Sequence, residues 1–132
     1  MIVVDSSIVV AIIRKESDAA VWVDVLDKTP RAFMSVVSYV ETSMVVAGRR
    51  SGASFDSVDG TLTSLHVRVV PVTLEQGSVA LAAFLRFGKG RHLAGLNLAD
   101  CFAYALASSR NLPLLFKGND FVKTDIEPAW RP

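Results

Sequence analysis

The sequence predicts an α/β fold with three layers, in which helices cover both faces of a mainly parallel sheet. Short apolar runs typical of buried strands alternate with longer segments whose apolar residues recur at helical spacing. Apolar residues make up 51% of the 132 positions, which suits a sheet buried on both faces. The chain has no internal repeat, low-complexity tract or linker, so residues 1–132 are expected to form a single domain.

The first half of the chain predicts two strands and four helices. Apolar runs at residues 2–4 and 32–35 are the expected strands, and Pro30 separates the second strand from the helix before it. Four helices are expected: one opened by Ser6 and Ser7 and running to Ile13, one capped by Ser17 or Asp18, one at 36–50 closed by Gly52, and one at 54–65.

The second half predicts strands at residues 67–72 and 113–116, with helices at 74–87 and 97–110 between them. A basic loop rich in glycine, residues 88–95, separates the two helices. The tail from Asp125 to Trp130 is expected to add an edge strand. Strands that alternate with helices in this way are typical of parallel sheets.

Composition and the start of the chain predict a soluble, cytoplasmic protein. The chain lacks a basic start, Asp5 interrupts the first apolar run, and no uncharged apolar stretch reaches 18 residues, so neither a secretory leader nor a membrane span is expected. The single Cys101 excludes an internal disulfide and is expected to be a packed core thiol. The net charge of +1 gives no sign of a nucleic-acid partner, so binding to nucleic acid would depend on local basic patches.

Four carboxylates lie where strands should end or helices should begin: Asp5, Glu41, Asp100 and Asp120. In an open α/β sheet these places meet in the crevice beyond the carboxyl ends of the strands. Carboxylates gathered there repel one another unless a hard cation joins them, and Mg²⁺ or Mn²⁺ favours oxygen ligands. The pattern therefore predicts a metal site for a phosphodiester substrate, where one or two ions would orient and acidify a water molecule.

Each acid also has a purely structural interpretation. Asp5 could cap the helix that follows it, and Asp100 could complete a capping box with Asn97. Glu41 could belong to a similar box with Ser38, although Ser35 is an equally good helix start, and Asp120 could be a turn residue. The metal site is favoured because strand ends and helix starts meet at one edge of such a sheet, whereas chance would scatter four acids over both edges.

Other residues are candidates for supporting roles. Ser7 and Asn119 could donate to the carboxylates or to a substrate phosphate, or could be a helix cap and a turn residue. Basic residues could bind the phosphate backbone of a nucleic acid or belong to solvated loops; they are Arg86, Lys89, Arg91, His92, Lys117 and Lys123.

The sequence resembles the PIN-domain ribonucleases, and among them the VapC toxins of bacterial type II toxin–antitoxin pairs. The motifs that carry this resemblance are Asp5-Ser6-Ser7, Ser38-x-x-Glu41, Asn97 to Ala105, and Lys117-Gly118-Asn119-Asp120-Phe121-x-x-Thr124-Asp125. Two positions depart from the usual pattern, because Leu93 stands where related toxins usually have Pro and Ala99 where they often have Gly. Neither change affects an acid.

The resemblance implies a sheet of five parallel strands, a homodimer, and Mg²⁺- or Mn²⁺-dependent cleavage of structured RNA such as tRNA or ribosomal RNA. It also implies a bacterial cytoplasmic location and a cognate VapB-type antitoxin, for which the Trp22 helix could offer a groove; core packing of Trp22 is the alternative. Asp5, Glu41 and Asp100 match the three most constant acids of the family's metal site. Asp120 matches a more variable fourth acid, and Asp125 is a nearby candidate.

Three other functions remain open. A PIN nuclease for RNA maturation would carry the same acids, and a PIN-like binding module without activity would keep the fold alone. A Mg²⁺-binding phosphoacceptor domain also uses acids and a lysine such as Lys117. That third function requires paired acids after the first strand, whereas Asp5 is followed by two serines.

Overall fold

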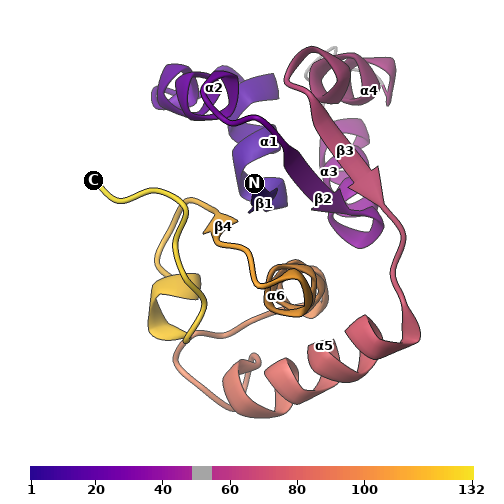
Figure 1. Ribbon diagram of the computed structural model, residues 1–132, viewed down its shortest axis with the longest axis vertical. Helices are drawn as coiled ribbons and strands as arrows, with labels where there is room; N and C mark the ends of the chain where they lie inside the picture. Colours follow the sequence, from indigo (N-terminus) through magenta and orange to yellow (C-terminus); the bar gives the residue numbers. More distant parts are fainter. Residues whose placement is uncertain (49–54) are drawn as a thin grey trace.

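Four parallel strands form one sheet in the order β3-β2-β1-β4 (Figure 1). The computed structural model describes residues 1–48 and 55–132, and it describes Phe55 and Asp56 by their backbone only. The strands are β1 (Ile2–Val4), β2 (Ala32–Ser35), β3 (Val67–Val70) and β4 (Leu114–Leu115). The parallel sheet predicted from the sequence is thus confirmed, with four strands in the described part of the chain.

Six α-helices and one short 3₁₀-helix complete the described residues. They are α1 (Ser6–Ile13), α2 (Ala19–Asp27), α3 (Val36–Ala47), α4 (Phe55–Ser64), α5 (Leu74–Phe87), α6 (Leu98–Arg110) and η1 (Phe121–Lys123). In Figure 1, α1, α2 and α4 lie on one side of the sheet, whereas α6 lies on the other side with α5 outside it. No helix of the described segments is long and apolar enough to span a membrane.

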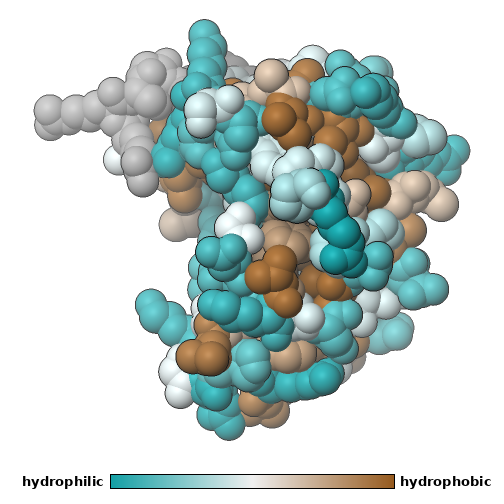
Figure 2. Space-filling model, turned by 90° about the vertical axis from the view of Figure 1, so that its left-hand side faces the viewer, coloured by the Kyte–Doolittle hydropathy of each residue, from teal (hydrophilic) through white to brown (hydrophobic). Residues whose placement is uncertain are grey.

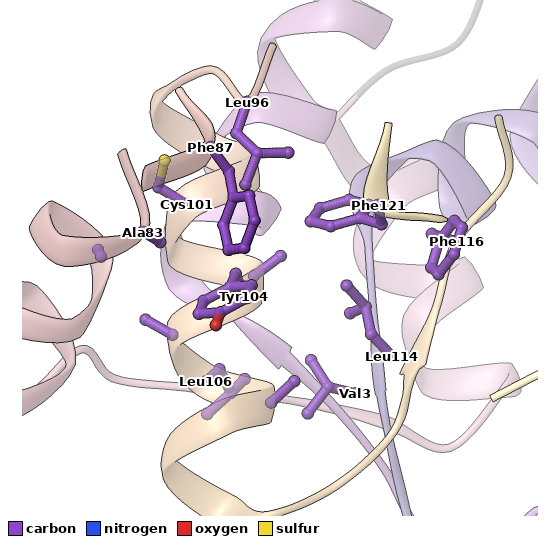
Figure 3. Close-up of a cluster of buried hydrophobic side chains, with 14 of the residues drawn as sticks. Val3, Ala83, Phe87, Leu96, Cys101, Tyr104, Leu106, Leu114, Phe116 and Phe121 are labelled. Atoms are coloured by element: carbon purple, nitrogen blue, oxygen red, sulfur yellow. The ribbon is translucent and has the colours of Figure 1, made fainter. Parts of the chain in front are cut away.

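The sheet has an apolar core on each face because side chains alternate along a strand. Val3 points into the core shared with α5 and α6, where it meets Leu106 and Leu114 (Figure 3). Its neighbours Ile2 and Val4 point into the opposite core, which α1, α2 and α4 complete. Cys101 is a buried free thiol in the first core, as predicted, and burial raises its pKa to about 11.

The central position of β1 determines where a site can form. Its residues pair with β2 on one side and with β4 on the other. The chain leaves β1 toward β2 and β3, and returns through α5 and α6 to β4 on the opposite side. The carboxyl ends of β1 and β4 therefore flank the point where the strand order reverses, which is the usual ligand crevice of open α/β sheets.

The predicted fifth strand is wrong. The tail makes a single bridge with β4: the Leu114 N–H donates to the Glu127 carbonyl, and the Ala129 N–H donates to the Leu114 carbonyl, both at 2.9 Å. Pro128 lies between these contacts and has no N–H of its own. The chain then leads to Trp130, whose ring packs edge-on against Trp22 at 5.0 Å between centroids.

The other predicted elements lie close to the observed ones. Helix α5 has the predicted bounds, and the predicted strand at 67–72 is shorter by two residues. Helix α3 ends at Ala47, with Gly48 as its C-cap, before the predicted end at Arg50. Arg50, Gly52 and the predicted helix start at residue 54 lie outside the described residues.

Candidate metal centre

Asp5 joins the end of β1 to the start of α1. Its backbone is extended, and its side chain caps the helix through Oδ2, which accepts hydrogen bonds from the Ser7 N–H (3.1 Å) and the Ser7 hydroxyl (2.6 Å). The other oxygen, Oδ1, is buried and has no hydrogen-bond partner among the described residues. A buried carboxylate oxygen without a donor is costly, so it is the natural place for a cation.

The charge of Asp5 is disfavoured by its surroundings. The residue is only 4% exposed. Burial is the main cause that raises its pKa, and the negative charge of Glu41 raises it further, whereas the bonds from Ser7 act in the opposite direction. A nearby positive charge would restore the ionised form.

Glu41 reaches Asp5 from the second turn of α3. That helix begins directly after β2, with Ser35 as its N-cap, so Ser38 is not the cap. Glu41 Oε1 accepts a hydrogen bond from the hydroxyl of Ser6, the residue that follows Asp5. The immediate passage from strand to helix thus brings this acid to the end of β1.

Asp100 lies in the first turn of α6 and forms the predicted capping box with Asn97. The Asp100 N–H donates to Asn97 Oδ1 (2.9 Å), and the Asn97 N–H donates to Asp100 Oδ2 (3.0 Å). Burial raises the pKa of Asp100 to about 7, and the charges of Asp5, Glu41 and Asp120 each add to the increase. The pKa of Asp100 therefore depends on the charges of all three other acids.

Asp120 is the most accessible of the four acids. It lies after β4, at the start of η1, and its side chain makes no capping hydrogen bond. Gly118 has a φ of +97°, a conformation that favours glycine, and this turn leads the chain to Asp120. Its charge contributes to the pKa of Asp100, so the loop brings it to the same side of the sheet.

The donor set fits a hard divalent cation in charge and chemistry. Asp5, Glu41 and Asp100 each hold one oxygen with a protein donor, and no bond to the other oxygen is found among residues 1–48 and 55–132. Within those residues, no three acidic, histidine or cysteine side chains already form a ligand set for one ion. Like charges keep carboxylates apart, so a cation would have to draw the free oxygens together.

The PIN-domain profile matches residues 2–127, which include all four acids. The chain belongs to the PIN-domain family. It is 41% identical over 128 residues to ribonuclease VapC28 of Mycobacterium tuberculosis, covering 96% of each chain. It is also 42% identical over 124 residues to the ribonuclease VapC of Mycolicibacterium smegmatis, covering 94% of this chain and 96% of that one.

Two solved structures share the fold at low sequence identity. VapC20 of Mycobacterium tuberculosis, described as a toxin that cleaves the sarcin-ricin loop, has a TM-score of 0.75 and 18% identity over 96% of each chain. A toxin–antitoxin complex from Klebsiella pneumoniae has a TM-score of 0.70 and 14% identity, covering 95% of this chain and 93% of that one. These likenesses support the PIN fold found here.

The structural interpretation of the acids in this PIN domain is also correct for two of them. Asp5 and Asp100 both cap helices, yet each does so with one oxygen, and no bond to its second oxygen is found among the described residues. Helix capping and cluster formation are therefore not alternatives. A cap at a strand end places a carboxylate at the crevice, and its free oxygen is available there.

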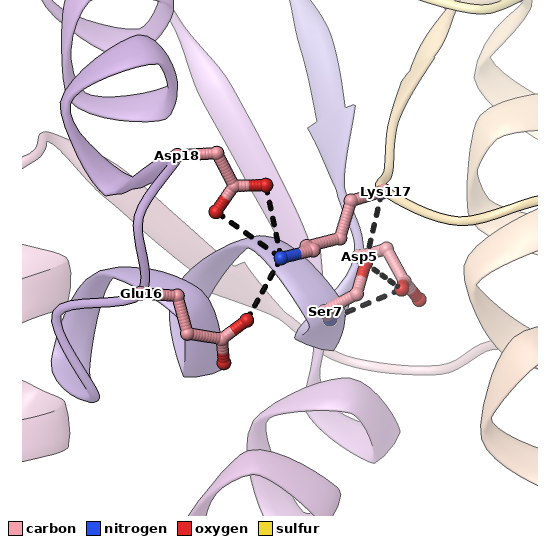
Figure 4. Close-up of polar contacts among 5 residues, drawn as sticks. All are labelled: Asp5, Ser7, Glu16, Asp18 and Lys117. Carbon is pink, nitrogen blue, oxygen red and sulfur yellow. Dashed lines mark hydrogen bonds and ion pairs between the residues drawn. The ribbon is translucent and has the colours of Figure 1, made fainter.

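Of the supporting candidates, Ser7 contacts one of the four acids, Asp5, directly. Its hydroxyl donates to Asp5 Oδ2 and accepts the backbone N–H of Lys117 (3.2 Å), as Figure 4 shows. The side chain of Lys117 points elsewhere, to Glu16 and Asp18. Asn119 is exposed and lines a cavity of about 660 Å³ between α2 and the tail, so the structure does not bring it to the carboxylates.

The predicted basic candidates are partly engaged with other groups. Arg86 pairs with Asp125 (3.2 Å) and stacks over the ring of Phe87 (4.6 Å). Arg91 donates through Nε to the carbonyl of Leu85 (3.3 Å), whereas Lys89 is exposed. The second oxygen of Asp125 accepts the Tyr104 hydroxyl (2.6 Å), so both of its oxygens are occupied.

Trp22 packs in the core, as the alternative interpretation of its helix expected. It is 4% exposed and lies against Trp130. The cavity beside these rings faces the side of the molecule that carries α2 and the C-terminal end, where hydrophobic patches lie among hydrophilic ones (Figure 2).

Sequence reasoning missed the contacts that hold the acids. Ser6 was expected only to open a helix, and no role was expected for Glu16, while Asp18 was considered only as a cap. Their partners lie far away in the chain: Ser6 and Glu41 are 35 positions apart, and Glu16 and Lys117 are 101 apart. No local pattern predicts such pairs.

Proposed function

We propose that this PIN domain is an endoribonuclease that depends on Mg²⁺ or Mn²⁺ and acts as the toxin of a toxin–antitoxin pair. The observation that carries this proposal is the unpaired, buried Oδ1 atom of Asp5; the pKa of Asp100, raised by burial and further by the charges of the three other acids, supports it. Asp5 and Asp100 would hold the ion, with Glu41 and Asp120 completing its ligands. All four are proposed as the catalytic acids.

A bound divalent ion supplies positive charge for the phosphate and a water of lowered pKa. The side chains of the protein contribute position and charge. Ser7 fixes the rotamer of Asp5, and Ser6 fixes one oxygen of Glu41. With its pKa raised to about 7, the carboxyl group of Asp100 is partly protonated at neutral pH in the metal-free protein and would lose that proton when the cation binds.

The proposed substrate is structured RNA, such as tRNA or ribosomal RNA, in the bacterial cytoplasm. The names of the similar ribonucleases support RNA as the substrate class, and VapC20 itself is a toxin described as cleaving the sarcin-ricin loop. Lys89 is exposed and available to a phosphate backbone, whereas Arg86 and Arg91 would have to leave their present partners.

The proposed protein partners are a VapB-type antitoxin and a second copy of the chain. An apolar groove of about 520 Å³ runs between α3 and the start of α6 and includes Val40, Met44 and Leu98, with Glu41 at its border. An antitoxin segment with apolar residues and one basic side chain would fit this groove and the acids. Light scattering would test the proposed homodimer.

Cleavage assays test the proposed enzyme. Purified protein should cut tRNA or ribosomal RNA with Mg²⁺ or Mn²⁺ and stop when EDTA is added. Asp5→Asn, Glu41→Gln and Asp100→Asn should each abolish cleavage without unfolding the protein. Asp24→Asn is a matched control, because Asp24 is an exposed acid that pairs with Lys28 on α2. Full activity in one of the three site variants would exclude the substituted residue from the catalytic site.

Expression in a bacterial host separates a toxin from a maturation nuclease. Induction should arrest growth, and the antitoxin encoded beside the gene should restore it. A harmless protein that cuts RNA in vitro would favour the maturation nuclease, and a folded protein without cleavage would favour a binding module. The phosphoacceptor alternative is not supported, because the chain belongs to the PIN family and Lys117 is paired with Glu16 and Asp18.

A further inference from the structure

Lys117 is held by two carboxylates that do not belong to the acid cluster. Its Nζ atom lies 2.8 Å from Glu16 Oε1 and 2.9 Å from Asp18 Oδ2 (Figure 4). The three side chains are 30%, 35% and 34% exposed, so they are partly shielded from water. The hydrogen bond to Glu16 is the main cause that raises the pKa of Lys117, and the bond from Lys117 lowers the pKa of Asp18.

The backbone of the same lysine acts on Asp5 through Ser7. A backbone N–H can only donate, so Ser7 Oγ must accept the Lys117 N–H and use its single proton for Asp5 Oδ2. The lysine therefore sets the direction of the Ser7 hydroxyl. That hydroxyl in turn holds Asp5 Oδ2 and leaves Oδ1 as the free oxygen.

The loops that carry these charges are positioned by backbone geometry. Lys15 has a φ of +54° and reverses the chain after α1, where the Glu16 N–H donates to the Ala11 carbonyl (3.0 Å). This turn directs Glu16 and Asp18 toward the loop after β4. Lys117 starts that loop, and Asp120 follows it by three residues.

We propose that Glu16, Asp18 and Lys117 form a charge clamp that positions Asp5 and Asp120 for metal binding. In this role Lys117 is a positioning residue: its ammonium group anchors the loop after β4, and its N–H orients Ser7. This inference rests on the proposed function, because it assigns the clamp to the same site. It also replaces the interpretation of Lys117 as an RNA contact.

The two roles of Lys117, as part of the clamp or as an RNA contact, predict different effects on metal and RNA binding when Glu16 and Asp18 lose their charges. If Lys117 binds RNA, the Glu16→Gln/Asp18→Asn variant frees its ammonium group and strengthens RNA binding. If Lys117 positions the site, the same variant weakens metal binding as Lys117→Met does. The losses of metal affinity caused by Lys117→Met and by Glu16→Gln/Asp18→Asn should not add when the changes are combined, because both break the same interaction.

The experiment compares Mn²⁺ affinity, RNA binding and amide exchange in these variants. Titration calorimetry should show Mn²⁺ binding about 10–100-fold weaker than in wild type for Lys117→Met and for Glu16→Gln/Asp18→Asn, the usual range for groups that orient metal ligands. The KM for tRNA at saturating Mn²⁺ and its salt dependence should be unchanged. In metal-free protein, the Lys117 amide of the Glu16→Gln/Asp18→Asn variant should exchange faster with solvent.

Lys28→Met is the matched control, because it breaks an exposed lysine–aspartate pair on α2. It should leave Mn²⁺ affinity unchanged. Lys117→Arg keeps the charge and should restore most of the affinity that Lys117→Met loses. The Glu16→Gln/Asp18→Asn variant leaves the lysine in place, so it tests the clamp even if Lys117→Met does not fold.

Two results would overturn the clamp. One is Mn²⁺ affinity equal to wild type in the Glu16→Gln/Asp18→Asn variant, while the wild type binds Mn²⁺ and cleaves RNA; the proposed function would then stand without the clamp. The other is a lower KM for tRNA in that variant, which would make Lys117 an RNA contact. A wild type that neither binds Mn²⁺ nor cleaves RNA would overturn the proposed function, and the clamp with it.

Discussion

The hydroxyl of Ser6 donates a hydrogen bond to Oε1 of Glu41 and so joins the first residue of α1 to the second turn of α3. Ser6 directly follows Asp5, and the charge of Glu41 is one of the causes that raise the pKa of Asp5. One hydrogen bond therefore keeps two acids from different helices within electrostatic reach. It occupies one oxygen of Glu41 and leaves the other for a cation.

The Ser6→Ala variant should bind Mn²⁺ about 10–100-fold more weakly than wild type, because Glu41 loses the donor that orients it. Titration calorimetry measures this effect. Ser43→Ala is a suitable control, because the Ser43 hydroxyl also lies on α3 but donates to the Tyr39 carbonyl. Equal Mn²⁺ affinity in Ser6→Ala and wild type would show that Ser6 has no part in the site.

The raised pKa of Asp100 predicts how stability depends on pH. Its ordinary value is 3.8, and the folded protein raises it to about 7. Between these values the folded, metal-free protein holds a proton that the unfolded chain releases. The free energy of unfolding should therefore fall as pH rises from about 4 to 7, with no further loss from Asp100 above that range.

Urea unfolding in EDTA across this range tests the prediction with Asp100→Asn. Asparagine keeps an oxygen for the Asn97 N–H but has no charge, so the variant should lose less stability with rising pH and be the more stable protein at pH 8. Parallel curves for the two proteins would show that the fold does not raise the pKa of Asp100.

Tyr104 and Asp125 belong to a structural contact that is distinct from the acid cluster. Burial is the main cause that raises the pKa of Tyr104 to about 12, and its hydrogen bond to Asp125 adds to this. Tyr104→Phe should lower the free energy of unfolding by about 1 kcal/mol, because a hydrogen bond to a partly exposed carboxylate is lost. Mn²⁺ affinity should not change.

Tyr39→Phe is the matched control for chemical denaturation, since the Tyr39 hydroxyl donates to the exposed Asp59 (2.7 Å). It should cost less stability than Tyr104→Phe, because Tyr39 is the more exposed of the two tyrosines. Weaker Mn²⁺ binding in Tyr104→Phe would instead place Asp125 in the metal site.

The acids could be found from the sequence because their positions depend on local rules. A carboxylate after a buried strand, or in the first turn of a helix, lies at a known edge of a parallel sheet. Asp5 after β1 and Asp100 after Asn97 follow these rules directly. The central place of β1 followed from connections on both of its sides.

The contacts that orient the acids could not be found in the same way. The N–H of Lys117 reaches Ser7 across 110 positions, and its ammonium group reaches Asp18 across 99. Such pairs form only once the turn at Lys15 and the loop after β4 are placed in space. The prediction of an edge strand in the tail was wrong for a different reason. The apolar pattern of the tail suggested a strand, but Pro128 limits its pairing with β4 to one bridge.

The most direct test of the metal site is the free energy of unfolding of wild type, Asp5→Asn, Asp120→Asn and Asp125→Asn, measured in EDTA and in Mn²⁺. With free Mn²⁺ at about ten times its dissociation constant, wild type should gain about 1.4 kcal/mol by mass action. Asp125→Asn should keep that gain, and Asp5→Asn and Asp120→Asn should lose most of it. In EDTA these two variants should be at least as stable as wild type, because repulsion is relieved. A wild type indifferent to Mn²⁺, with Asp5→Asn and Asp120→Asn destabilised in EDTA, would contradict the account and leave these acids with structural roles alone.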